Sequence, residues 1–270
     1  MRFDILTIFP NFFSGPLDHG ILSRAIATGA VEVATHDLRA FTHDRHRTVD
    51  DRPFGGGEGM VLKAQPIFEC AESLGVAEKS GRDASRQSVI LLSAQGKRFT
   101  QAAAHRLAAL EQVVLICGRY EGVDERVNDL LCDDELSIGD YVLSGGELAA
   151  AVVIDAVVRL LPGVLGHADS SRYESFGARD DLADAMTSDG VPRSTHGAGG
   201  LLDYPHYTRP AEFRGVGIPE VLGGGDHAAI RRWRRQMALE KTWRNRPDLL
   251  VDAALGDDDR EFLAGLSGAE

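Results

Sequence analysis

Short apolar runs alternate along the N-terminal part of the chain with longer mixed segments. Five runs have the length of β-strands, at 3–9, 31–38, 89–93, 113–116 and 136–138. Two helix-compatible segments lie between them, at 16–28 and 100–110. Near-continuous apolar strands that alternate with helices indicate a parallel sheet covered on both faces. We therefore predict an α/β fold.

Residues 146–161, GELAAAVVIDAVVRLL, predict a further helix that ends before Pro162. The segment is apolar nearly all round, so it should be buried against the sheet or in a subunit interface. A monomer core and a dimer interface explain this pattern equally well.

The character of the chain changes after Pro162. Residues 166–200 are rich in Gly, Ala, Ser and Asp with little periodicity, as in an interdomain linker. Residues 201–254 predict a small helical domain, and residues 255–270 an acidic, frayed tail without an assigned role. The first 165 residues would then form the main domain.

Length and composition fit a soluble globular protein of one large and one smaller domain, with 270 residues of which 26% are charged. No run of about 18 apolar residues predicts a membrane span. Asp4 interrupts the first apolar run, so the start reads as a strand rather than a signal peptide. Cys70, Cys117 and Cys132 show no CxxC pairing, which argues against a disulfide framework or zinc site and fits a reducing cytoplasm.

The formal net charge of −12 argues against nonspecific nucleic-acid binding, so any RNA contact must come from local basic patches. Residues 230–246 hold seven basic residues against one acidic residue, Glu240, together with Trp233 and Trp243. This concentration is typical of an RNA-facing surface. An apolar face at Ile230, Trp233, Met237 and Leu239 equally indicates a core helix, and we expect one role on each face.

Two glycine-rich turns follow the strands at 113–116 and 136–138. Strand ends in open α/β sheets leave backbone groups free for ligands, and glycine allows close approach. Each turn alone could be an ordinary loop, but two such turns within about 30 residues favour a binding site. The glycines are Gly118, Gly122, Gly139, Gly145 and Gly146.

A standard dinucleotide-binding fold does not fit the glycine pattern. Phe9-Pro10-Asn11 follows the first strand where a GxGxxG turn would stand, and the cluster at 55–59 lacks the GK[ST] ending of a phosphate loop. The surrounding segment, 42–63, mixes arginines with carboxylates. It is either a solvated loop or a mobile lid whose arginines meet phosphates. His43 and His46 have no third partner with metal-ligand spacing.

Residues 116–127, ICGRYEGVDERV, and 137–147, SIGDYVLSGGE, closely resemble the bacterial tRNA (guanine-37-N1)-methyltransferases, the TrmD family of the SPOUT class. The resemblance runs from Met1 to about Leu250. It implies a deep trefoil knot around 90–150, which composition and periodicity could not have predicted. It also implies S-adenosylmethionine as methyl donor, tRNA with guanine at position 37 as substrate, and a homodimer in which the linker base of one subunit serves the other.

The resemblance assigns the cofactor contacts, most of them through backbone atoms. They fall on Leu92, Ser93, Gly118, Tyr120, Glu121, Gly122, Ile138, Gly139, Asp140, Tyr141, Val142, Leu143, Gly145 and Gly146. Segment 42–63 would help to hold the target nucleotide, although the family usually has proline where Glu58 stands. Some members use Mg²⁺, but nothing in the sequence marks a ligand set.

Methyl transfer to guanine N1 requires removal of its proton by a base and a cation or N–H donor for the charge that builds on O6. The resemblance places the cation at Arg159, where apolar neighbours would make an unpaired arginine costly. It places the base at Glu174, where the family normally has aspartate. Glu174 could instead be a solvated linker carboxylate, and Asp169, Asp180 and Asp181 are alternative bases.

Two rival functions remain open at this point. One is a knotted methyltransferase that acts on ribosomal RNA or another tRNA position. The other is a noncatalytic RNA-binding protein of the same fold. Activity on tRNA with guanine or adenine at position 37 tests the first, and S-adenosylmethionine binding tests the second.

Overall fold

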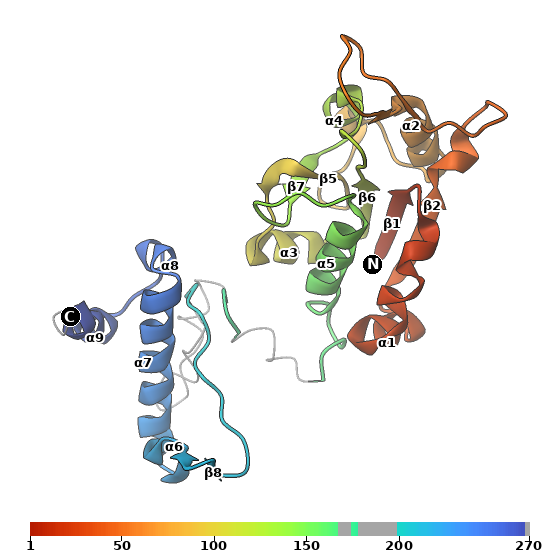
Figure 1. Ribbon diagram of the computed structural model, residues 1–270. Coiled ribbons are helices and arrows are strands. Elements are labelled where there is room, and N and C mark those ends of the chain that lie inside the picture. The colour runs from red at the N-terminus through yellow and green to blue at the C-terminus, as the bar shows by residue number, and fades with distance from the viewer. Residues whose placement is uncertain (167–173, 178–198, 268–270) are drawn as a thin grey trace. The chain divides into compact units, whose positions relative to one another are not determined.

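The computed structural model describes residues 1–166, 174–177 and 199–267. These residues belong to two compact units, Met1–Leu165 and Gly166–Glu270 (Figure 1). Most of the linker predicted at 166–200 lies outside the described residues. Among the described residues, no helix combines the length and the apolar character needed to cross a bilayer.

A five-stranded sheet forms the centre of the first unit. Its order is β2-β1-β6-β5-β7, and every neighbouring pair is parallel. The strands are β1 (Arg2–Thr7), β2 (Glu32–Asp37), β5 (Gln87–Arg98), β6 (Gln112–Cys117) and β7 (Asp134–Ser137). The predicted α/β fold with a parallel sheet is confirmed, and each predicted strand is present with bounds shifted by a few residues.

Helices cover both faces of this sheet (Figure 1). On one face pack α1 (Gly20–Ala27), α3 (Gln101–Ala108) and α5 (Glu147–Val158). On the other pack α2 (Ala64–Ser73) and α4 (Glu125–Leu130). Alternate strand residues divide between the two cores, with Ile5 in the first and Leu6 in the second. Burial on both sides explains why the strands read as continuous apolar runs.

The helix predicted at 16–28 is interrupted. A 3-10 turn, η2 (Pro16–Asp18), ends at His19, whose backbone is extended, and α1 starts at Gly20 with a φ of 65°. Glycine adopts this left-handed value without a Cβ clash, so the chain can change direction there. The other short elements are η1 (Pro10–Ser14), η3 (Leu38–Phe41), η4 (Lys79–Gly81), β3 (Asp50–Asp51) and β4 (Val61–Leu62).

Helix α5 is buried along most of its length, as its composition predicts. Ala150, Val153 and Ile154 are fully buried, whereas Leu148 and Val152 are about half exposed. The helix therefore serves the core of this unit and still presents part of its apolar surface.

The second unit is built around α7 (His227–Asn245), which includes the segment predicted at 230–246 except its last residue, the C-cap Arg246. Asp226 caps α7 by accepting hydrogen bonds from the N–H groups of Ala228 and Ala229. The remaining elements are β8 (Glu212–Phe213), β9 (Val216–Gly217), α6 (Glu220–Gly223), α8 (Asp248–Val251) and α9 (Asp257–Ser267). The prediction of a frayed tail is wrong, because α9 is a helix joined to α7 by an ion pair between Asp259 and Arg235.

Candidate functional site

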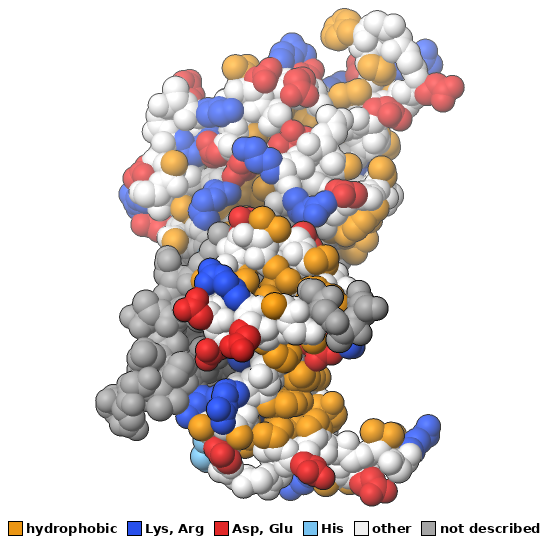
Figure 2. Space-filling view, turned by 90° about the vertical axis from the view of Figure 1, so that its left-hand side faces the viewer, with side chains coloured by type: hydrophobic (Ala, Val, Ile, Leu, Met, Phe, Trp, Pro, Cys, Tyr) orange, Lys and Arg blue, Asp and Glu red, His pale blue; other side chains and the backbone are white. Residues whose placement is uncertain are grey.

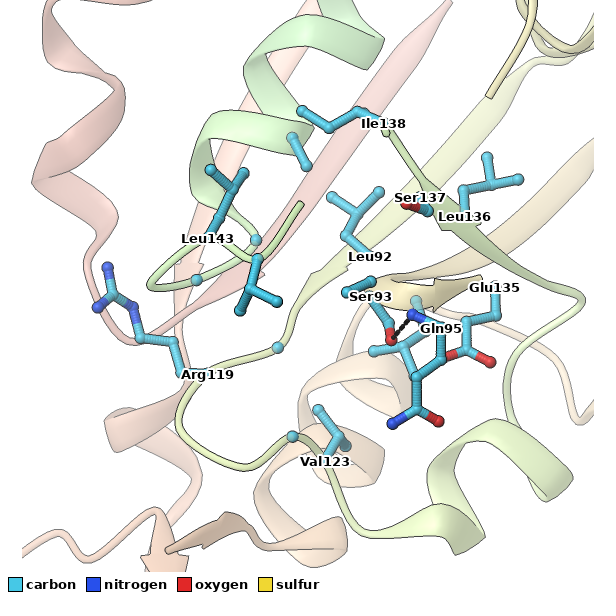
Figure 3. Close-up of a pocket in the computed structure, with 18 of the residues that line it drawn as sticks. Leu92, Ser93, Gln95, Arg119, Val123, Glu135, Leu136, Ser137, Ile138 and Leu143 are labelled. Carbon is cyan, nitrogen blue, oxygen red and sulfur yellow. Dashed lines mark hydrogen bonds between the residues drawn. The ribbon is translucent and has the colours of Figure 1, made fainter. Parts of the chain in front are cut away.

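The carboxyl ends of β6 and β7 lie level with the middle of β5. Leu92 of β5 is in register with Cys117 of β6 and with Leu136 of β7. After Cys117 and Ser137, β6 and β7 lead into turns, and after Leu92 the regular pairing of β5 with β7 is interrupted until Lys97. Backbone groups at these places are available to a ligand. The turns enclose a cavity of about 480 Å³ (Figure 3).

The structure brings together around this cavity every residue that the sequence predicts as a cofactor contact, with the exception of Asp140. The side chain of Asp140 is mostly exposed and accepts a hydrogen bond from Arg98 at 2.7 Å. Its place in the run 138–143 made it a candidate, but adjacency in sequence does not make every residue of a turn face inward.

Sequence reasoning missed several lining residues. In Figure 3, Ser93 and Gln95 lie side by side, and the Gln95 N–H donates to the Ser93 hydroxyl at 3.0 Å. Most of the missed residues are one or two positions from a predicted one, so sequence proximity could have found them. They are Leu91, Ala94, Gln95, Arg119, Val123, Glu125, Glu135, Leu136, Ser137, Ser144 and Ala149.

Two glycines of the cavity are required by close backbone approach. The Gly146 N–H donates to the Gly118 carbonyl at 2.9 Å. A Cβ at Gly146 would lie 2.7 Å from the Cα of Cys117, and a Cβ at Gly118 would lie 3.3 Å from the Leu92 carbonyl oxygen. Larger residues would push the second turn away from the first and change the shape of the cavity.

A buried carboxylate, Glu147, links the two glycine turns to β1. Glu147, the first residue of α5, is 1% exposed and accepts a hydrogen bond from the Thr7 hydroxyl at 2.8 Å. The Arg119 Nε also donates to it, at 3.3 Å, and the Arg119 guanidinium stacks over the Phe9 ring at 4.4 Å from its centroid. β1, the turn after β6 and the start of α5 are thereby held together.

The glycine-rich segment 42–63 is attached to the cavity at its C-terminal end. Three backbone hydrogen bonds of 3.0 Å join it to the turn after β6, from Glu121 to Met60, from Leu62 to Gly122 and from Asp124 to Leu62. Phe54, within the segment, is fully exposed. The segment is therefore a hairpin anchored beside the cavity through β4, with an exposed aromatic ring in the loop between β3 and β4.

Tyr120 has an unusual backbone conformation in the same turn. Its φ of 60° lies in the left-handed region, which a non-glycine residue adopts only when the surroundings hold it there. Burial and a hydrogen bond with Asp50 of the hairpin raise the pKa of its phenol. The side chain is still half exposed and lines the cavity.

The predicted catalytic pair is divided between the two units. Arg159 follows the last residue of α5 and is partly exposed, rather than enclosed by its apolar neighbours as the sequence suggests. Glu174 begins a turn in which its carbonyl accepts a hydrogen bond from the Gly177 N–H at 3.1 Å. The Phe176 N–H donates to the Leu201 carbonyl at 2.9 Å, which fixes this turn within the second unit. The alternative bases Asp169, Asp180 and Asp181 lie outside the described residues.

The described residues offer neither a reactive thiol nor a metal cluster at the site. Burial, with a smaller contribution from Glu147, raises the pKa of Cys117 well above that of a free thiol. Among the described residues there is no group of three or more His, Cys, Asp or Glu side chains that could hold a metal ion. The described residues therefore do not support a Mg²⁺ site. His43 instead pairs with Glu69 at 2.9 Å.

Comparison with known proteins identifies the family of this chain. The family described as "tRNA (Guanine-1)-methyltransferase TrmD" matches residues 1–252. The tRNA (guanine-N(1)-)-methyltransferase of Koribacter versatilis (strain Ellin345) is 60% identical over 266 residues, and that of Geobacter sulfurreducens is 52% identical, each alignment covering 98% of both chains. The enzyme of Moorella thermoacetica is 51% identical over 270 residues, which is all of this chain and 98% of that protein. The chain therefore belongs to the TrmD family of tRNA (guanine-N1)-methyltransferases.

Proposed function

We propose that this protein methylates N1 of guanine 37 in tRNA, beside the anticodon, with S-adenosylmethionine as the methyl donor. The observation that carries the proposal is the cavity beside the middle of β5 and the ends of β6 and β7, which collects the predicted donor contacts from three separate segments. Its volume of about 480 Å³ is typical of small-molecule sites. Membership of the family supports the same reaction.

The charges of the cavity suit a cationic donor. Glu121, Glu125 and Glu135 line it, and Arg119 is the single basic residue among the described lining residues. Carboxylates close to a bound cation lower its electrostatic energy, more strongly away from bulk water. When bound, S-adenosylmethionine supplies a methyl group already activated by its sulfonium, so the protein needs no nucleophile of its own.

Glu174 and Arg159 are the residues proposed to act on the guanine that accepts the methyl group. A carboxylate at Glu174 can take the proton from guanine N1 as that nitrogen attacks. The guanidinium of Arg159 can stabilise the negative charge on O6, because it stays protonated at any physiological pH. Asp169, Asp180 and Asp181 remain alternative bases, and mutation can separate them.

We further propose a homodimer in which Glu174 of one subunit serves the cavity of the other. Leu148 and Val152 expose about half their surface on the otherwise buried helix α5. Helix η1, which packs against α5, exposes Phe12. Apolar side chains grouped in this way commonly mark an interface, and a two-fold dimer is the commonest symmetric assembly.

The path of residues 137–146 supports a trefoil knot. The Phe99 N–H, beyond β5, donates to the Ser137 carbonyl at 2.7 Å. The Gly146 N–H donates to the Gly118 carbonyl, beyond β6, and Gly145 forms an isolated bridge with Arg119. The segment therefore lies against the residues that follow two different strands before α5 begins, as a chain threaded through a loop would.

We assign tRNA binding to residues 201–254. Trp233 of α7 lies beside Tyr204 and Tyr207, with ring centroids 6.4 and 6.3 Å apart, and the Arg234 guanidinium lies over Tyr204. Tyr207 is half exposed and Trp233 partly exposed, so these rings can stack on unpaired bases while neighbouring cations meet phosphates, and the buried Tyr204 supports them. A tRNA substrate and three free, buried cysteines favour the cytoplasm as the place of reaction.

Transfer of labelled methyl groups to tRNA transcripts tests the proposed function. Transcripts with guanine at position 37 should accept the label at N1, and those with adenine there should not. If both transcripts accepted the label, or if the label appeared at another base, the enzyme would methylate a position other than guanine 37. If calorimetry showed no binding of S-adenosylmethionine, the proposed catalytic function would be wrong.

A further inference from the structure

Helix α9 lies against α7, the most basic of the helices in the described part of the chain. Asp259 of α9 accepts two hydrogen bonds from the Arg235 guanidinium, at 2.7 and 3.1 Å, and both side chains are about nine-tenths buried. Asp259 also accepts from the Gly256 N–H, and Arg235 donates to the Ala254 carbonyl. A bidentate arginine–carboxylate pair of low exposure is strong and geometrically specific. It fixes the start of α9 on α7 in the second unit (Figure 1).

The two helices enclose a groove of about 1120 Å³ with walls of opposite charge. The wall from α7 contains Arg231 and Arg232, and the wall from α9 contains Asp257, Asp258 and Glu261. Acidic, basic and hydrophobic side chains lie close together on this part of the second unit (Figure 2). Among the described residues no ion pair within the salt-bridge distance joins Arg231 or Arg232 to a carboxylate, so the acidic wall acts on them through space.

Two further basic side chains of α7, Arg234 and Lys241, are placed differently, while Arg244 pairs with Glu240 of the same helix. Arg234 and Lys241 are seven positions apart, share a face of the helix and do not line the groove. Arg234 lies over Tyr204, in the aromatic cluster with Trp233. One face of α7 therefore combines cations with aromatic rings, and the cations of another face lie across the groove from the carboxylates of α9.

We propose that α9 is an electrostatic screen that determines which face of α7 binds RNA. Its carboxylates repel phosphates from Arg231 and Arg232, because exposed charges act over a Debye length of about 8 Å at physiological ionic strength. Asp257 is partly neutralised by an exposed ion pair with Arg260 at 3.3 Å, so Asp258 and Glu261 contribute most of this repulsion. RNA is thereby confined to the face with Arg234, Lys241 and the aromatic rings. The screen suppresses sequence-independent binding, which depends on the number of cations that reach phosphates. This inference rests on the assignment of RNA binding to the second unit.

The test uses the full chain with Asp257→Asn, Asp258→Asn and Glu261→Gln combined. All three side chains are exposed and none pairs with Arg235, so α9 should remain docked. Binding of an unrelated RNA hairpin at 150 mM salt should tighten about tenfold or more. The slope of log K for the hairpin against log salt concentration should become more negative by about 1 to 2. Each arginine that contacts a phosphate adds about one to this slope. Binding of cognate tRNA should tighten less, so discrimination falls.

A matched control changes the net charge by the same amount elsewhere. Glu72→Gln, Glu78→Gln and Asp129→Asn remove three exposed carboxylates of the first unit. This variant should leave the salt slope for the hairpin unchanged. If hairpin affinity and salt slope changed equally in both variants, the effect would be one of net charge, and the proposed role of α9 would be wrong.

A mutant cycle gives an independent readout. Arg231→Gln with Arg232→Gln should weaken hairpin binding less than twofold in the wild-type background, and about tenfold when α9 is neutralised. A large loss in the wild-type background would show that these arginines already meet RNA, and would refute the screen. Wild-type protein that neither binds nor methylates tRNA would instead refute the proposed function, so the two failures are distinguishable.

Discussion

The hydroxyl of Thr7 donates a hydrogen bond of 2.8 Å to the carboxylate of Glu147, a residue 140 positions later in the chain. Thr7 ends β1, Glu147 begins α5, and both are buried. Arg119, in the turn after β6, donates to the same carboxylate. One side chain therefore fixes the two turns that carry Gly118 and Gly146 at the wall of the cavity.

Replacement of Glu147 by alanine should both destabilise the protein and weaken donor binding. A hydrogen bond to a charged group is worth roughly 1.5–3 kcal/mol, and Thr7 would lose its partner in a buried site. We expect a decrease of about 2–3 kcal/mol in the free energy of unfolding, measured by urea denaturation. Calorimetry should show weaker S-adenosylmethionine binding, because the turns are no longer fixed.

The conservative variants separate charge from hydrogen bonding. Glu147→Gln keeps an acceptor for Thr7 but removes the charge that faces Arg119, so its stability should fall between wild type and Glu147→Ala. Thr7→Val removes only the hydroxyl. If Glu147→Ala unfolded at the same urea concentration as wild type, the carboxylate would not hold the turns.

Gly146→Ala should reduce affinity for the donor by at least about tenfold. The added Cβ would meet the Cα of Cys117 at 2.7 Å, and backbone atoms cannot yield as a flexible side chain does. Gly15→Ala is the matched control, because Gly15 has a helical φ of −81° and no atom within 4 Å of the added Cβ. Calorimetry on both variants measures the effect, and equal affinities would show that the close approach is unimportant for binding.

Local sequence predicted the sheet and its helices because both signals are short-range. Val113 and Val114 face opposite cores, and burial on both sides produces the continuous apolar run that predicts a parallel strand. The glycine turns were recognisable for a similar reason, since a steric requirement at Gly146 restricts the residue type. The cavity-lining Arg119 was missed because its role depends on Glu147, 28 positions away.

Pairing at a distance also explains the error at the C-terminal end. Residues 255–270 read as an acidic tail because Asp257, Asp258 and Asp259 stand near the start of the segment. Three carboxylates in the first turn instead favour the helix through its dipole. Arg235 neutralises Asp259, and the sequence could not indicate that pairing because 24 residues separate them. The roles of Glu174 and Arg159 likewise came from family resemblance and not from local pattern.

Glu174→Gln should nearly abolish methyl transfer and leave S-adenosylmethionine binding unchanged. The amide keeps the shape of the side chain but cannot take the proton from guanine N1. Glu174→Asp, which installs the residue normal in the family, should retain measurable turnover. Single-turnover kinetics with tRNA measures both. A near-normal rate for Glu174→Gln would assign the base to Asp169, Asp180 or Asp181, which the corresponding asparagine variants would then identify.

The three cysteines should be nearly inert in the folded protein. Burial raises the pKa of Cys70 and Cys132 to about 12 and that of Cys117 well above its ordinary value. Only the thiolate reacts readily with disulfide reagents, so very little reactive species exists at pH 8. A thiol titration should therefore be slow in native buffer and yield three equivalents rapidly in denaturant. Fast reaction of one thiol in native buffer would reveal local opening around it.

Asp4 should make stability depend on pH in the acid range. Its carboxylate is fully buried and accepts hydrogen bonds from Arg2 at 2.8 and 2.9 Å, from Gln112 at 2.7 Å and from His36 at 2.8 Å. Burial alone would raise the pKa of this carboxyl, but the hydrogen bonds from Arg2, Gln112 and His36 outweigh it and lower the pKa. A carboxyl whose pKa is lower in the folded state stabilises the protein fully above its unfolded pKa of about 3.9, and this stabilisation is lost as pH falls through the folded value.

Asp4→Asn isolates this contribution. The variant should be less stable than wild type at pH 7, and the difference should shrink progressively below about pH 4, where the wild-type carboxylate takes up its proton. Glu111→Gln is the control, since Glu111 also has a lowered pKa through Arg86 but lies in an exposed pair that contributes little. Urea denaturation between pH 7 and pH 3 measures both. A constant difference between wild type and Asp4→Asn across that range would mean that Asp4 acts through packing rather than through its charge.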